Sequence, residues 1–140
     1  MAEKTLNDIS EIVSDMDICM LSSISKGEII SRPMSNNGDV EYDGNSYFFT
    51  SEETEIARDI STNPQVNLAF SDTDNQVYIS VSGIAKLVSD KSKMEEHWVD
   101  ELEQWFEDGI DTPGIVMIHV DAKKIKYWDN DKEGEVKLEN

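Results

Sequence analysis

Short β-prone segments recur along the whole chain, separated from one another by turn-forming residues or by helical stretches. In the clearest of them, Val77, Ile79 and Val81 occupy alternate positions, as in a strand with one buried face. Comparable segments cover residues 18–25, 29–35, 46–51, 66–70, 77–88, 115–120 and 124–128. Strands in hairpin order, with helices only between blocks of strands, favour an antiparallel barrel over a parallel sheet. The sequence therefore predicts a mainly β fold with flanking helices.

Glycine and proline set further limits on these strands. Gly83 lies inside the segment 77–88, where a glycine indicates a bulge or a close approach of another backbone. Pro33 has no amide hydrogen for a ladder, so it restricts the segment 29–35 to a sheet edge or a bulge. Lys26-Gly27-Glu28 predicts the turn of a hairpin, and residues 36–39 and 43–45 carry further turn signals.

Three stretches have helical periodicity. Residues 5–16 form an amphipathic pattern with Thr5 as a candidate N-cap, and residues 52–62 form a second, ended by Asn63-Pro64. Residues 91–106 form the longest, with an apolar stripe of Met94, Trp98, Leu102, Trp105 and Phe106. No repeat or linker divides the chain, so we expect one domain over residues 1–140, with 129–140 a loose polar tail.

The charge balance limits the partners that this chain can have. Thirty acidic residues face twelve basic ones, a formal net charge of -18. Such a surface repels nucleic acid and anionic membranes, so neither is an expected partner. The chain has no membrane-spanning apolar run and no signal-peptide layout at its start, so the expected location is cytoplasmic.

No cluster of residues predicts catalysis or metal binding. Cys19 lies in an apolar run beside Asp17, which favours a buried, inert thiol. His97 and His119 are far apart and match no metal-ligand spacing, and His119 is expected on the solvated or partner face of its strand. Neither a nucleophile elbow nor a zinc-protease motif is present. We therefore predict no catalytic side chain and no metal ligand.

Arg32 is one of two arginines, and its setting allows two interpretations. Beside a sheet edge, with the hydroxyls of Thr50 and Ser51 from another strand end, its guanidinium would form a phosphate-binding corner. Alternatively it is an edge-strand charge that opposes aggregation. Trp128 closes the last apolar strand, where an aromatic ring caps a flat ligand or a dimer seam.

Several motifs in order resemble one known family. They are Ser31-Arg32-Pro33-Met34, Phe48-Phe49-Thr50-Ser51, the segment 63–70, Val81-Ser82-Gly83, Trp105-Phe106 with Gly109 and Pro113, and Tyr127-Trp128-Asp129. Together they resemble the general-stress-protein branch of the pyridoxamine-phosphate oxidase-like, FMN-binding split-barrel proteins. The resemblance covers nearly the whole chain, from about Ile9 to Asp129.

This resemblance implies a six-stranded antiparallel split β-barrel that forms a homodimer, with flavin at the subunit interface. FMN is the implied cofactor, and FAD is an alternative because the adenylate half would lie outside the matched motifs. Arg32 would meet the flavin phosphate, Thr50 and Ser51 would hydrogen-bond it, and Trp128 would approach the ring from the partner subunit. The full implied cofactor-binding set is Arg32, Pro33, Met34, Ser35, Phe49, Thr50, Ser51, Trp105 and Trp128.

Two departures from the family pattern bear on function. Ile56 stands where the family has a lysine, and losing one charge-assisted phosphate contact costs about 1.5–3 kcal/mol. Arg58, on a different helical face, substitutes only in part. After Trp128 there is no Arg-x-His segment of the kind that grips vitamin B6 substrates in true oxidases. The predicted function is thus a flavin-binding stress protein with weak flavin-dependent oxidoreductase activity. The alternatives are a non-enzymatic flavin-binding or sensing module, or a dimeric protein that has lost its cofactor.

Overall fold

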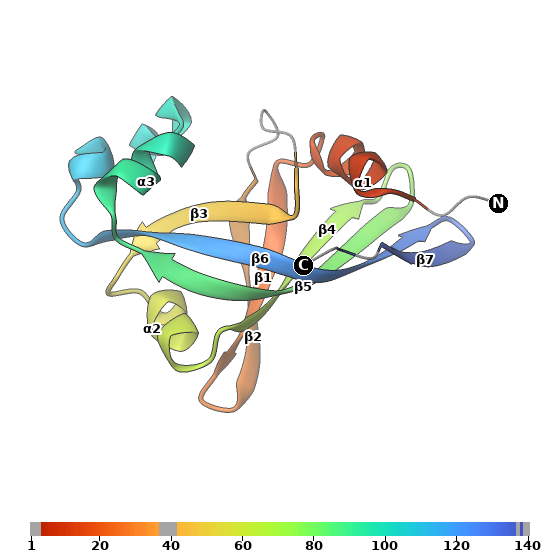
Figure 1. Cartoon of the computed structure of the whole chain (residues 1–140), viewed down its shortest axis with the longest axis horizontal. Coiled ribbons are helices and arrows are strands. Elements are labelled where there is room, and N and C mark those ends of the chain that lie inside the picture. The colour runs from red at the N-terminus through yellow and green to blue at the C-terminus, as the bar shows by residue number, and fades with distance from the viewer. Residues whose placement is uncertain (1–3, 37–41, 137, 139–140) are drawn as a thin grey trace.

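The computed structural model describes residues 4–36, 42–136 and 138. Over these residues, seven strands form one antiparallel sheet in the order β2-β1-β4-β5-β6-β3, with β7 paired to β6 (Figure 1). The strands are β1 (Ile18–Ser25), β2 (Glu28–Ser35), β3 (Asn45–Ser51), β4 (Gln65–Asp72), β5 (Val77–Val88), β6 (Ile115–Asp129) and β7 (Lys132–Val136). The sheet curls without closing into a continuous barrel, as the split-barrel prediction requires. The turn expected at 36–39 lies, beyond its first residue, outside the described residues.

The helices sit at the ends and along one side of this sheet. They are α1 (Leu6–Val13), α2 (Glu55–Thr62), α3 (Lys91–His97) and two short 3-10 turns, η1 (Asp100–Gln104) and η2 (Gly109–Asp111). Figure 1 shows α1 at one end, α3 with the 3-10 turns at the other, and α2 beside the β1–β2 hairpin. No helix in the described ranges is long and apolar enough to cross a membrane.

The first hairpin forms as the sequence predicts. Lys26 and Gly27 both adopt positive φ, 50° and 84°, which suits the tight two-residue turn between Ser25 and Glu28. β2 is the terminal strand of the sheet order, so Pro33 does lie on an edge strand.

A bulge on β6 accommodates Gly83. The β5–β6 register shifts between Ser82 and Gly83, whose partners are Lys124 and Ala122. A Cβ at Gly83 would lie 2.7 Å from the backbone oxygen of Asp121, so the strands approach too closely for any side chain here. The sequence prediction of a bulge or close approach at this glycine is confirmed.

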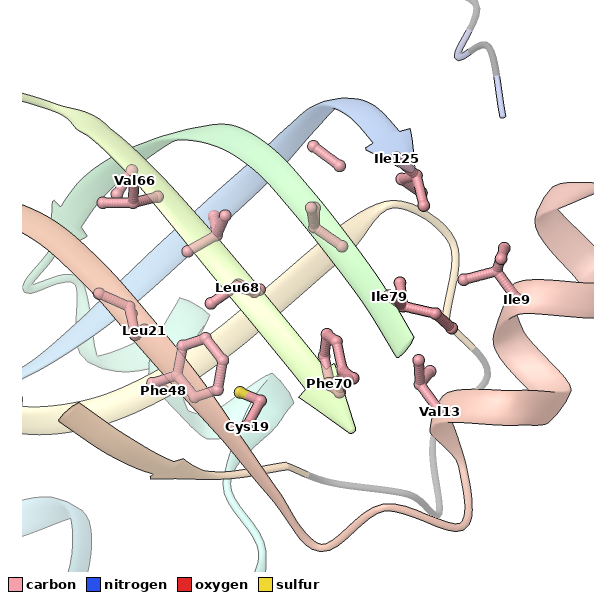
Figure 2. Close-up of a cluster of buried hydrophobic side chains, with 14 of the residues drawn as sticks. Ile9, Val13, Cys19, Leu21, Phe48, Val66, Leu68, Phe70, Ile79 and Ile125 are labelled. Atoms are coloured by element: carbon pink, nitrogen blue, oxygen red, sulfur yellow. The ribbon is translucent and has the colours of Figure 1, made fainter. Parts of the chain in front are cut away.

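The core lies inside the curled sheet, under α1 and α2. Its buried side chains come from both helices and from every strand except β2. Figure 2 shows Leu21 on β1 beside Leu68 and Phe70 on the adjacent strand β4, with Ile9 and Val13 of α1 covering one end. Burying such side chains contributes about 1.5–3 kcal/mol each and holds the sheet in its curled form.

Three sequence predictions need correction. The helix expected over 91–106 ends at His97, because Trp98 and Val99 are extended and the chain resumes as η1. Trp98 thereby turns its ring between Phe49 and Phe106. Trp105, assigned to the apolar stripe, is instead 69% exposed.

The other two corrections concern the end of the chain. The strands expected at 115–120 and 124–128 are one strand, β6, because the bulge carries it past Ala122. The expected loose tail contains β7, a seventh strand, joined to β6 by a tight turn in which Asn130 adopts φ 58°. Gly134 lets β7 lie against the ring of Tyr127, and Val136 is buried in the core.

Candidate functional site

Arg32 lies on the inner face of β2, beside α2. Its side chain is 19% exposed, and its Nη1 donates to the hydroxyl of Ser23, a buried residue of β1, at 3.0 Å. Its Nη2 lies 3.9 Å from Oδ2 of Asp59, whose side chain is 10% exposed. Inward-pointing charges on an edge strand also oppose aggregation, so this placement fits both interpretations of Arg32.

The Arg32–Asp59 contact is incomplete. A separation of 3.9 Å is too long for a hydrogen bond. Both Nη2 of Arg32 and Oδ2 of Asp59 are buried and have no hydrogen-bond partner among the described residues. Unmade hydrogen bonds of buried groups cost free energy, so the pair retains capacity to bind a further polar group.

The hydroxyl groups of the predicted site gather where β3 runs into α2. Thr54 is the N-cap of α2, and its hydroxyl lies 3.1 Å from that of Thr50. It also donates to the backbone oxygen of Ser51 at 2.8 Å. The hydroxyl of Ser51 accepts the amide of Glu53 at 3.3 Å. Thr54 was not predicted as a site residue, although a threonine before a helical pattern is a sequence signal for an N-cap.

Helix α2 connects the two halves of this site. Its N-terminal residue Glu55 accepts a hydrogen bond from Ser25 at the end of β1, at 3.5 Å. Asp59, beside Arg32, is five residues after the cap Thr54, which corresponds to about 7.5 Å of helical rise. The structure thus brings Arg32 and the Thr50–Thr54 hydroxyls to the same short helix from opposite edges of the sheet.

Position 56, where the family resemblance predicts a lysine, faces the core. Ile56 is 4% exposed and belongs to the main hydrophobic cluster. Arg58 is exposed, and its guanidinium donates to the backbone oxygen of Glu53 at 2.6 Å. Among the described residues of α2, no cation therefore stands beside Arg32.

The remaining β2 residues divide between two faces. Met34 is partly buried against the core cluster, whereas Pro33 and Ser35 are exposed on the opposite face. A flat ring lying along β2 can touch only one of these sets, because successive side chains point to opposite sides of a strand. The contact of all three with one ligand stays a prediction.

Two aromatic residues of the predicted set lie away from Arg32. Phe49 packs edge-on against Trp98, with ring centroids 5.1 Å apart, in a second cluster under α3. Trp105 follows η1 and is exposed. The structure does not bring either ring to the Arg32 end of α2.

Trp128 lies at the far end of β6 from Thr50. Thr50 pairs with Val116, and the twelve residues from 116 to 128 span about 40 Å of strand. Trp128 is half-buried, and its indole nitrogen donates to Glu133 of β7 at 2.7 Å. One chain therefore cannot place Thr50 and Trp128 against the same small ligand.

Tyr78 is a candidate residue that the sequence interpretation missed. It is Trp128's direct partner across β5 and β6, and it is exposed. The alternation of Val77, Ile79 and Val81 already placed it on the outer face, but an exposed tyrosine alone gave no reason to single it out.

The other candidate reactive groups stand apart from this site. Burial raises the pKa of the Cys19 thiol to about 12, which agrees with the predicted inert cysteine. Tyr47 stacks between the rings of His97 and His119, at centroid distances of 3.5 and 4.8 Å. Over residues 4–36, 42–136 and 138, no group of three or more potential ligands could hold a metal ion.

Comparison with known proteins agrees with this architecture. The profile of the family described as pyridoxamine 5′-phosphate oxidase like matches residues 4–139. The chain belongs to this family. General stress protein 26 of Bacillus subtilis is 27% identical over 135 residues, which cover 94% of this chain and 93% of that protein.

Solved structures of other proteins show the same fold. A protein related to general stress protein 26, from Clostridium acetobutylicum, superposes with a TM-score of 0.83 at 21% identity, covering 95% of this chain and 94% of that one. The general stress FMN/FAD binding protein of Xanthomonas citri gives 0.78 at 20% identity, covering 96% and 95%. The predicted family and its split-barrel fold are therefore confirmed.

Proposed function

We propose that this pyridoxamine 5′-phosphate oxidase-like protein binds FMN between two copies of the chain. The observation that carries the proposal is the convergence of Arg32 and the Thr50–Thr54 hydroxyls on helix α2. A half-buried guanidinium with an unused donor, beside the same short helix whose N-terminal end carries these hydroxyl groups, fits the terminal phosphate of a flavin. The Xanthomonas citri relative, described as FMN/FAD binding, supports the same ligand class.

The length of β6 supports a site shared by two protomers. Because Trp128 lies about 40 Å of strand away from Thr50, its ring can reach a flavin whose phosphate is held at Thr50 only from a partner. Exposed apolar side chains lie on the same outer sheet face as Trp128, namely Ile18, Met20 and Tyr78. Such a patch beside Trp128 suits a self-complementary dimer contact.

The residues of this site bind and orient rather than transfer protons. When bound, the flavin itself supplies the electron- and hydride-transfer chemistry. Arg32 would neutralise part of the phosphate charge, Thr50 and Ser51 would hold its oxygens, and the partner's Trp128 would cover one ring face. Among the described residues, Asp59 is the titratable side chain that lies against Arg32. We therefore propose flavin binding with at most weak oxidoreductase activity.

The vitamin B6 oxidase reaction is not part of this proposal. The chain after Trp128 turns into β7 without an arginine or a histidine, so the Arg-x-His segment expected of a vitamin B6 oxidase is missing there. Reduction of the bound flavin by NADH or NADPH would separate an oxidoreductase from a binding or sensing module.

Titration with FMN, FAD and riboflavin, followed by flavin fluorescence, tests the proposal. The wild-type protein should show saturable binding in the micromolar range. Arg32→Ala should weaken FMN binding about ten- to a hundredfold, because a charge-assisted phosphate contact contributes about 1.5–3 kcal/mol. Arg58→Ala is the matched control and should change the affinity little, since Arg58 bonds only to the Glu53 backbone in this site.

A fold control is needed because Arg32→Ala leaves Asp59 buried without a cation. Thr50→Val, which keeps the shape of the side chain and removes its hydroxyl, should weaken FMN binding by a smaller factor without this charge problem. The proposal is refuted if the folded wild-type protein binds no flavin at millimolar concentration.

A further inference from the structure

The incomplete contact between Arg32 and Asp59 presents one buried donor and one buried acceptor side by side. Nη2 of Arg32 and Oδ2 of Asp59 are 3.9 Å apart, and neither has another hydrogen-bond partner in the described part of the chain. Arg32 is held in place from the other side by Ser23, and Asp59 is held by the second turn of α2. The two atoms therefore form a fixed pair rather than a loose surface contact.

The chemistry of a ligand group decides how well it satisfies this pair. A hydroxyl, or a phosphate that retains one proton, donates to Oδ2 and accepts from Nη2 at the same time. A phosphate dianion only accepts, so it satisfies Nη2 and leaves Oδ2 unpaired against two negative charges. The pair thus matches a group that both donates and accepts.

The surroundings of the pair do not offset this preference. Ile56 is apolar and buried, and the guanidinium of Arg58 is engaged with the Glu53 backbone. Glu55 adds a second carboxylate to α2. On a chain whose net charge is -18, one arginine shared with a carboxylate is a weak attractor for a dianion.

We propose that Asp59 sets the charge selectivity of this site, opposing dianionic phosphate and favouring the hydroxyl of an unphosphorylated flavin or a singly protonated phosphate. This inference rests on the proposed flavin site and names Asp59 as its specificity-determining residue. It predicts that the phosphate of FMN adds little to affinity at alkaline pH.

The test compares FMN with riboflavin, because the ratio of their dissociation constants isolates the phosphate. At pH 8 the phosphate is mostly dianionic, since its second pKa is about 6. The wild-type protein should bind the two flavins within about threefold of each other. Asp59→Asn keeps the side-chain shape and removes the charge, so it should tighten FMN about tenfold and leave riboflavin unchanged. Asp74→Asn, in the exposed β4–β5 turn, controls for the change in net charge.

A pH series gives a second readout. Between pH 8 and pH 5.5 the wild-type protein should bind FMN more tightly as the phosphate takes up a proton, whereas riboflavin binding should stay constant. Asp59→Asn should lose most of this dependence. An FMN-to-riboflavin ratio that stays the same or shifts toward riboflavin in Asp59→Asn overturns the inference and leaves the proposed function standing. Absence of binding of both flavins to wild type and variant refutes the proposed function, and this inference with it.

Discussion

Replacing Gly83 by alanine tests the close approach of β5 and β6 at the bulge. The added Cβ would lie 2.7 Å from the backbone oxygen of Asp121 and 3.0 Å from Cγ1 of Val120. A backbone oxygen cannot rotate away, so the two strands must separate. Overpacking of this kind costs about 1–3 kcal/mol. The reduced freedom of the unfolded chain returns about 0.4–1 kcal/mol. The midpoints of these two ranges give an expected net loss of stability of about 1.3 kcal/mol.

Equilibrium urea unfolding, followed by tryptophan fluorescence, measures this loss as a lower midpoint at unchanged slope. Ser82→Ala is the matched control, because Ser82 precedes Gly83 on the same strand and is exposed. It should change the free energy of unfolding by less than about 0.5 kcal/mol. If Gly83→Ala were as stable as the wild type or more stable, the strands could not be as close as the structure places them.

Two further predictions concern titratable side chains. Burial, with Lys86 opposite, lowers the pKa of His119 below 6.5, so the unfolded chain takes up this proton first as the pH falls. The stability that neutral His119 contributes is complete above about pH 6.5 and decreases below it. His119→Gln should therefore lose less stability than wild type between pH 7.5 and 5.5, and equal losses would contradict this. Cys19 is 1% exposed with its pKa raised to about 12, so iodoacetamide should label it at pH 8 only as fast as the protein unfolds. Rapid labelling of the native protein would show that Cys19 is accessible.

Local signals in the sequence were sufficient for most of the sheet. Alternating apolar residues located β4 and β5, and Gly83 and Pro33 indicated the bulge and the edge strand correctly. A bulge at a glycine and an edge strand at a proline each depend on one residue, through its missing side chain or its missing amide hydrogen, so the sequence alone is enough to predict them. The prediction of one helix over 91–106 was wrong, because the apolar spacing on which it relied continues past His97. The helix ends there as Trp98 packs against Phe49, a residue distant in sequence.

The candidate site was predictable only in part, for a similar reason. Family resemblance named Arg32, Thr50 and Ser51, but it gave no sign that Asp59 would stand beside Arg32, because that contact depends on how α2 packs against the first hairpin. β7 was missed because Val136 is its one strongly apolar residue, so the segment shows no alternating apolar pattern. Gly134 fits against the ring of Tyr127 only because β7 pairs with β6, and the sequence of β7 alone does not show that pairing.

A mixture of two defective variants tests most directly whether the flavin site is shared between protomers. Arg32→Ala and Trp128→Ala should each bind FMN weakly, since one removes the phosphate contact and the other the partner's aromatic wall. After subunit exchange of an equal mixture, half of the dimers would be heterodimers, each with one site free of both substitutions. About a quarter of all sites should therefore regain wild-type FMN affinity. No recovery after confirmed exchange, or full FMN binding by a monomer, would contradict a shared site.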